Sequence, residues 1–212
     1  MPILKLQNIS YAYAKGKDIL SDISLELEAS KLYAILGPSG SGKTTLLSLL
    51  GGLDTPTRGH ILFDGEDIRA TGLHHHRRNH VSLIFQSYNL VDYMTPPENV
   101  RLTAKRDAAP ILERLGLHQD EITRNVLKLS GGQQQRVAIA RALASDAPII
   151  LADEPTGNLD ADTAREITAI LRESAHALGK CVVVVTHSGE VANQADMVLE
   201  LNRGHLKERT AR

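Results

Sequence analysis

The chain has 212 residues, enough for one compact domain or for a core domain with a small attached subdomain. Its 24 Lys and Arg residues nearly balance its 25 Asp and Glu residues, which argues against a nucleic acid backbone as the main partner. The N-terminus lacks the layout of a signal peptide, and no stretch approaches the roughly 20 apolar residues that span a bilayer, so we expect a protein that is soluble by itself.

The first third of the chain predicts an antiparallel layer of strands. Residues 3–9 and 23–27 alternate apolar with polar side chains, as half-exposed strands do, with a loop at 14–17 between them. Residues 60–63 and a second short strand near Ile68 flank Asp64-Gly65-Glu66, which is a hairpin signal. Between these pieces, residues 31–36 predict a strand and residues 43–50 a helix.

The rest of the chain predicts an α/β core with a helical insertion. Residues 82–85, 149–152 and 182–185 are continuous apolar runs, typical of central parallel strands covered on both faces. Strand signals are absent between 88 and 144, where 108–115 and 133–144 predict helices. A helix from about 162 to 178 ends at Gly179, a shorter one covers 190–195, and residues 197–206 fold back through 202–204. The single cysteine, Cys181, cannot form an intramolecular disulfide, and we interpret it as a buried thiol.

The pattern G-x-x-x-x-G-K-[ST] lies between the predicted strand 31–36 and the helix 43–50. Such a turn leaves successive backbone N–H groups unpaired, and the helix adds the positive end of its dipole, which together make a cradle for a polyphosphate. A glycine-rich turn without a ligand is the alternative. In the phosphate interpretation Lys43 contacts the β- and γ-phosphates, and the Thr44 hydroxyl is a ligand of Mg²⁺. The residues of this loop are Gly37, Pro38, Ser39, Gly40, Ser41, Gly42, Lys43, Thr44 and Thr45.

Two carboxylates, Asp153 and Glu154, follow the apolar run at 149–152. At a strand edge that meets a Mg–nucleotide, Asp153 would hold the Mg²⁺ shell directly or through water. Glu154 would then stand beside the γ-phosphate and deprotonate the attacking water. The alternative is an acidic pair that caps the next turn, but this leaves the phosphate loop without its usual metal partner.

Ser130, followed three residues later by Gln133, forms a capping-box pattern, so a helix begins here with its N–H groups exposed by Gly131 and Gly132. This is a second anion-binding helix end. Because the chain already has one phosphate cradle, this second anion-binding helix end is explained if it closes on the nucleotide held by another molecule. An ordinary N-cap before a surface helix is the alternative.

With these motifs, the chain resembles the ATPase subunits of ABC transporters, and the resemblance covers nearly its whole length. The motifs that carry it occur in the family's order: the phosphate loop, Gln86 at a strand end, Leu-Ser-Gly-Gly-Gln at 129–133, Asp153-Glu154, Asn158-Leu159-Asp160, and His187 at a strand end. The resemblance implies a P-loop NTPase core with an antiparallel β layer at 1–86 and 145–212, and a helical signature subdomain at 87–144.

The resemblance also implies roles for single residues. Tyr13, with Tyr11 as the alternative, falls where these ATPases stack a ring on adenine. Gln86 resembles the glutamine that senses Mg²⁺ and the attacking water, and His187 the histidine that contacts the γ-phosphate and orients the catalytic glutamate. Asp160 resembles the residue that crosses the dimer interface. The remaining set would bind the γ-phosphate held by the partner's phosphate loop: Ser130, Gly131, Gly132 and Gln133.

Within the family, the chain is similar to the lipoprotein-release, macrolide- and peptide-export and cell-division branch (LolD, MacB and FtsE types). This similarity implies ATP and Mg²⁺ as ligands, a homodimer with ATP between the subunits, and attachment to the cytoplasmic face of the membrane through a permease contacted near residues 86–93. The segment 101–128 is shorter than usual for that branch, and residues 125–128 lack the proline often found before the signature. The alternatives are the ATPase of a nutrient importer and an ABC-type ATPase of DNA repair, chromosome organisation or translation.

The run His74-His75-His76 raises the question of a metal site. Three adjacent residues on a helix point about 100° apart and do not converge on one ion. We therefore expect a solvated helical face that leads into the strand at Val81.

Overall fold

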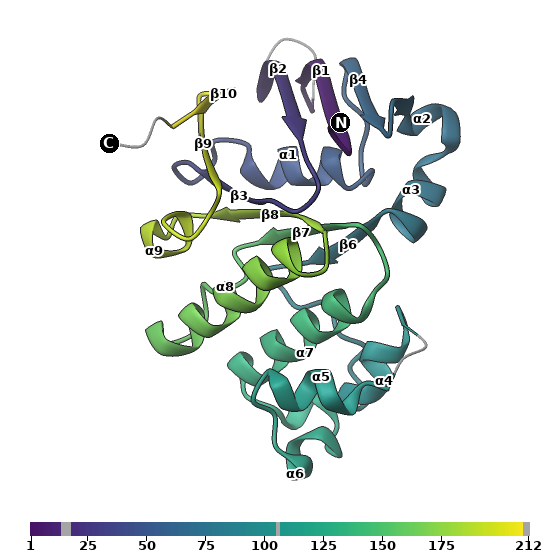
Figure 1. Ribbon diagram of the computed structural model, residues 1–212, viewed down its shortest axis with the longest axis vertical. Coiled ribbons are helices and arrows are strands. Elements are labelled where there is room, and N and C mark those ends of the chain that lie inside the picture. Colours follow the sequence, from purple (N-terminus) through teal and green to yellow (C-terminus); the bar gives the residue numbers. More distant parts are fainter. Residues whose placement is uncertain (14–17, 105–106, 210–212) are drawn as a thin grey trace.

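The computed structural model describes residues 1–13, 18–104 and 107–209, so the loop predicted at 14–17 lies outside the described residues. The N-terminal strands form an antiparallel sheet with the order β2-β1-β4-β5, at the top of Figure 1. Its strands are β1 (Leu4–Tyr11), β2 (Leu20–Leu27), β4 (Arg58–Phe63) and β5 (Glu66–Asp67). The predicted antiparallel layer is confirmed.

A second, six-stranded sheet has the order β10-β9-β3-β8-β7-β6. Neighbouring strands in it are parallel except for β10, which folds back antiparallel onto β9. The strands are β3 (Leu32–Leu36), β6 (Val81–Ile84), β7 (Ile149–Asp153), β8 (Cys181–Thr186), β9 (Met197–Asn202) and β10 (His205–Glu208). The three apolar runs predicted as central strands are strands of this sheet, and β7 and β8 lie inside it as expected. The run at 82–85 is not central, because β6 is the edge strand and pairs with β7.

Both faces of the inner strands β3, β7 and β8 are covered, which is why these strands are almost wholly apolar. The strands β9 and β10 also carry exposed polar residues. Ile149 and Leu151 of β7 pack in the cluster that contains α1 and the antiparallel layer, whereas Ile150 and Ala152 pack against α7 and α8 on the other face. Figure 1 shows the same arrangement, with α1 between the two sheets and α7 and α8 below. Cys181 is fully buried, and burial raises the pKa of its thiol to about 12.

The remaining elements are helices. They are α1 (Lys43–Leu50), α2 (Ile68–Thr71), α3 (Leu73–Asn79), α4 (Pro96–Arg101), α5 (Ala109–Arg114), α6 (Gln119–Ile122), a 3-10 turn at Val126–Lys128, α7 (Gly131–Ala144), α8 (Ala161–His176) and α9 (Gly189–Ala192). Within the part of the chain that the structure describes, no helix is long and apolar enough to cross a bilayer.

Helix α4 is an element that the sequence analysis missed, although its start carries a signal. Thr95 is its N-cap, and the Glu98 carboxylate accepts hydrogen bonds from the Thr95 N–H at 2.7 Å and the Thr95 hydroxyl at 2.8 Å. This Thr-x-x-Glu capping box, with a proline at the first helical position, predicts a helix. Together with α5, α6 and the first turns of α7, it makes up the lower part of Figure 1.

The predicted hairpin is confirmed, since β4 and β5 pair antiparallel. Its second strand ends at Asp67, because the Asp67 carboxylate accepts the Arg69 N–H at 2.8 Å and so starts helix α2 at Ile68. One local prediction is wrong. The face expected to be solvated at His74-His75-His76 includes a fully buried ring, that of His76. Its Nε2 lies 3.0 Å from the carbonyl oxygen of Leu50, the last residue of α1, so His76 joins α3 to α1.

Candidate active site

The phosphate loop lies between β3, which ends at Leu36, and α1, which begins at Lys43. Gly42 caps the helix with a φ of 100°, a left-handed conformation that favours glycine. A side chain on Gly37 would clash with the carbonyl oxygen of Leu201 on β9. The loop is therefore held close to the carboxyl edge of the parallel sheet, where its N–H groups gather at the start of α1.

The Lys43 ammonium is folded over this loop, donating to the carbonyl oxygens of Gly37 at 2.8 Å and Pro38 at 3.0 Å. The Ser41 hydroxyl is buried in the loop and has no hydrogen-bond partner among the described residues. A lysine bonded only to carbonyls, next to an unsatisfied hydroxyl, leaves donors that an anion can take up.

The two carboxylates at the end of β7 differ in environment. Asp153 is only 7% exposed, and burial raises the pKa of its carboxyl group, while the nearby Thr44 hydroxyl and Lys43 act in the opposite direction. Glu154 turns away from the strand with a φ of 46°, and its N–H donates to the carbonyl of Val185 on β8 at 2.9 Å. A left-handed glutamate costs energy, so the sheet edge holds this side chain in a conformation that it would not adopt alone.

Glu154 is paired with His187, which follows β8. Oε1 of Glu154 lies 2.9 Å from Nδ1 of His187. The contact brings together residues 33 positions apart, because β7 and β8 are parallel neighbours and both end at this edge.

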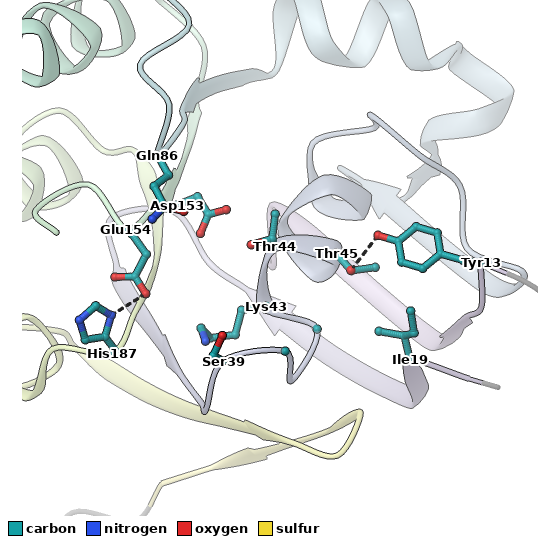
Figure 2. A pocket seen from close by; sticks show the side chains of 12 residues that line it. Tyr13, Ile19, Ser39, Lys43, Thr44, Thr45, Gln86, Asp153, Glu154 and His187 are labelled. Carbon is teal, nitrogen blue, oxygen red and sulfur yellow. Dashed lines mark hydrogen bonds and ion pairs between the residues drawn. The ribbon is translucent and has the colours of Figure 1, made fainter. Parts of the chain in front are cut away.

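These side chains surround a hollow of about 600 Å³, shown in Figure 2. It is lined by Tyr13, Ile19, Ser39, Gly40, Gly42, Lys43, Thr44, Thr45, Gln86, Asp153, Glu154 and His187. Of the predicted loop residues, Gly37, Pro38 and Ser41 are not in this lining. Ile19 is a lining residue that the sequence analysis missed; its N–H donates to the Tyr11 carbonyl at 2.7 Å, on the other side of the predicted loop at 14–17.

The two candidate aromatic residues are in different environments. Tyr11 is buried and donates to the Asp54 carboxylate; this hydrogen bond, together with burial, raises the Tyr11 pKa to about 12. Tyr13 is 71% exposed, and its hydroxyl lies 3.2 Å from the Thr45 hydroxyl. The two rings meet edge to face, with centroids 5.1 Å apart. Tyr13 alone of the two lines the hollow.

The residues of the second predicted anion site do not line this hollow. The Ser130 hydroxyl accepts the Gln133 N–H at 3.3 Å, and the Gln133 side chain accepts the Ser130 N–H at 2.8 Å, which confirms the capping box at the start of α7. Gln133 also donates to Glu121. Asp160 is the N-cap of α8 and accepts the Thr163 N–H at 3.0 Å. Within one chain, the structure keeps Ser130, Gly131, Gly132, Gln133 and Asp160 apart from the pocket.

The donor set of the hollow fits a Mg–nucleotide. Thr44, Gln86 and Asp153 supply a hydroxyl, an amide and a carboxylate oxygen, and Mg²⁺ prefers oxygen ligands. No group of three or more His, Cys, Asp or Glu side chains among the described residues could hold a metal by itself.

A strand, a phosphate loop and a helix, facing a strand that ends in two carboxylates, define a P-loop NTPase of the α/β class. Residues 20–157 match the family model described as ABC transporter, and the chain belongs to that family as one of its ATPases.

Similar proteins cover nearly the whole chain. The uncharacterized ABC transporter ATP-binding protein YclH of Bacillus subtilis is 43% identical, over 96% of this chain and 95% of that protein. The macrolide export ATP-binding/permease protein MacB of Brucella melitensis is 42% identical over 97% of this chain, which spans only 34% of that relative. The dimeric structure of MJ0796, a bacterial ABC transporter cassette, has a TM-score of 0.89 at 35% identity and covers 99% of this chain and 100% of that one. The same cassette has also been solved in a post-hydrolysis state bound to ADP and Pi, with a TM-score of 0.88 at 34% identity and coverage of 99% of this chain and 100% of that one.

Proposed function

We propose that this ATPase works as a homodimer around two ATP molecules and drives a membrane partner. The system would be an exporter or a force-transmitting machine for peptides, antibiotics, lipoproteins or other amphiphiles. The observation that carries the catalytic part is the hollow in which Lys43, Asp153 and the Glu154–His187 pair face one another. MacB relatives named for macrolide export support the transport class.

In the proposed reaction, the ATP phosphates accept hydrogen bonds from the N–H groups of the loop. Lys43 exchanges its two carbonyl partners for phosphate oxygens. Thr44, Asp153 and Gln86 would hold Mg²⁺, which when bound offsets phosphate charge. Glu154 accepts a proton from water as the water oxygen bonds to the γ-phosphorus and the bond to the leaving ADP oxygen breaks. His187 holds the carboxylate in place through Nδ1, and Tyr13 stacks on adenine.

A second copy would complete the site. Ser130, Gly131, Gly132 and Gln133 form an exposed to half-buried helix start outside their own chain's hollow, with N–H groups and the positive end of a 14-residue helix to offer. We assign them to the γ-phosphate of the ATP held by the partner copy, with Asp160 at the interface. The similar MJ0796 cassette, whose structure is dimeric, supports the dimer itself. Hydrolysis then requires closure, which ties the chemistry to movement.

The membrane partner would dock beside residues 86–93. A second hollow, of about 980 Å³, adjoins this segment and includes Phe85 and Asn89 in its lining. Its lining also contains the arginines Arg77, Arg78, Arg101 and Arg141, against one acidic residue, Asp146. This charge favours an acidic segment of the permease, which would hold the ATPase at the cytoplasmic face of the membrane.

The test is Glu154→Gln, which keeps the shape of the side chain and removes the base. ATP turnover should fall by about 10²–10⁴-fold, while ATP binding persists and an ATP-dependent dimer accumulates in sedimentation velocity. Glu166→Gln, at an exposed position on α8, is the matched control and should turn over normally. Near-normal hydrolysis by Glu154→Gln would remove Glu154 from the proposed role.

A further inference from the structure

Tyr88 lies in a turn that follows Gln86 and is held by helix α7. Tyr88 and Asn89 both have left-handed backbones, with φ of 60° and 49°. The Arg141 guanidinium donates to the carbonyl oxygens of Tyr88 at 2.9 Å and Asn89 at 2.6 Å. Two strained residues held by one planar side chain indicate a turn whose shape is imposed by its surroundings.

The Tyr88 hydroxyl reaches two segments that are distant in sequence. It accepts a hydrogen bond from the Asn158 side-chain amide at 3.0 Å. A Cβ added to Gly131, the first residue of α7, would lie 3.2 Å from the same hydroxyl. A Cβ on Gly132 would likewise lie 3.4 Å from a methyl group of Leu159. The two glycines therefore let the start of α7 pack closely on Tyr88 and Leu159.

These contacts join the two halves of the proposed composite site within one chain. Tyr88 follows shortly after Gln86, and Asn158 shortly after Glu154, and both Gln86 and Glu154 line the hollow. Tyr88 and Asn158 meet beside Gly131, which lies outside that hollow. A shift of either pocket segment would thus move a side chain that rests on the helix start.

We propose that Tyr88 is a positioning residue whose hydroxyl, bonded to Asn158 beside Gly131, sets the position of the α7 start relative to the chain's own pocket. The inference rests on the proposed function, in which this helix start binds the ATP of the partner copy. ATP bound in a chain's own pocket then affects the α7 start of the same chain. That helix start is the part that faces the ATP of the partner copy. This coupling requires only that the hydrogen bond between Tyr88 and Asn158 can be formed or broken.

The first test measures ATP-driven dimerisation of the Glu154→Gln protein with and without Tyr88→Phe, by sedimentation velocity. Loss of the hydroxyl should raise the dissociation constant of the dimer about fivefold, the change expected for the loss of one hydrogen bond. The Kd of ATP for the monomer should stay within about twofold, because Tyr88 does not line the hollow. Tyr33→Phe is the matched control, since it also removes a hydrogen-bonded hydroxyl, here the acceptor of the Glu28 N–H at 2.8 Å, and should leave dimerisation unchanged.

A double-mutant cycle identifies the partner of the hydroxyl. Asn158→Ala should weaken dimerisation as much as Tyr88→Phe does, and the double variant should be no worse than either single one. Unchanged dimerisation of Tyr88→Phe, or fully additive effects in the cycle, would overturn the proposal.

Amide hydrogen exchange in the monomer separates this inference from the proposed function. The first hydrogen-bonded amides of α7 report on its start, because the Gln134 N–H donates to the Ser130 carbonyl at 2.9 Å. Exchange at residues 134–137 should accelerate in Tyr88→Phe and not in Tyr33→Phe, whether or not ATP assembles a dimer. If Glu154→Gln fails to dimerise with ATP, the composite site is wrong. If exchange at 134–137 is the same in Tyr88→Phe and the unaltered chain, Tyr88 does not position the helix.

Discussion

Nδ1 of His187 lies 2.9 Å from Oε1 of Glu154, although 76% of the histidine side chain is exposed and only 14% of the glutamate side chain. A proton on Nδ1 would let the ring donate to the carboxylate, which accepts hydrogen bonds. We propose that the exposed ring in this way orients the shielded carboxylate.

His187→Ala should lower turnover at saturating ATP by roughly 10²-fold, the effect of misplacing a reacting group, with little change in ATP affinity. Steady-state kinetics and ATP binding measured separately would show this split. His205→Ala, at an exposed position on β10, should behave like the unaltered protein. A loss of ATP affinity equal to the loss of turnover would assign His187 to binding instead.

The exposed ring of Tyr13 predicts a binding effect. Tyr13→Ala should raise the Kd for ATP by roughly 5- to 160-fold, because stacking of a base on an aromatic ring contributes about 1–3 kcal/mol. Tyr13→Phe keeps the ring and loses only the contact with Thr45, so its affinity should stay close to normal. Isothermal titration of the monomer measures both. Equal losses in the two variants would point to the hydroxyl, and no loss in Tyr13→Ala would end the adenine assignment.

The position of Ser130 outside its own chain's hollow predicts a defect in assembly. Ser130→Arg should bind ATP as a monomer but fail to form the ATP-dependent dimer in sedimentation, because a long side chain would stand where the partner's γ-phosphate is expected. Ser130→Thr keeps a capping hydroxyl and should dimerise. Normal dimerisation of Ser130→Arg would contradict the composite site.

The burial of His76 predicts a pH-dependent stability. Burial lowers the pKa of this ring below its ordinary value of about 6.5, so the unfolded chain takes up a proton that the folded chain does not. The stability contributed is present above the unfolded pKa and is lost as the pH falls below about 6.5, by up to about 1.4 kcal/mol per pH unit.

His76→Gln should therefore flatten the fall in unfolding free energy between pH 7 and pH 5.5, measured by urea denaturation. His74→Gln, on the exposed side of α3, should keep the slope of the unaltered chain. An identical slope in His76→Gln would show that this ring does not contribute to the pH dependence of stability.

Several features could be predicted from the sequence because their signals are local. The phosphate loop is recognised by glycine and lysine spacing between a strand and a helix, and β7 and β8 by unbroken apolar runs. Capping chemistry is equally local, which is why the start of α7 at Ser130 was predicted, and why the Thr95 signal for α4 was available although it was missed.

Only the tertiary structure decided which residues meet. Tyr11 and Tyr13 look alike in the sequence, but packing against Asp54 buries the first and leaves the second at the hollow. His76 became a buried link to α1 through a contact 26 residues away, and Tyr88 reached Asn158 across 70 residues. Local propensity and hydrophobic period carry no information about such pairs, because they depend on how sheets and helices pack after each has formed.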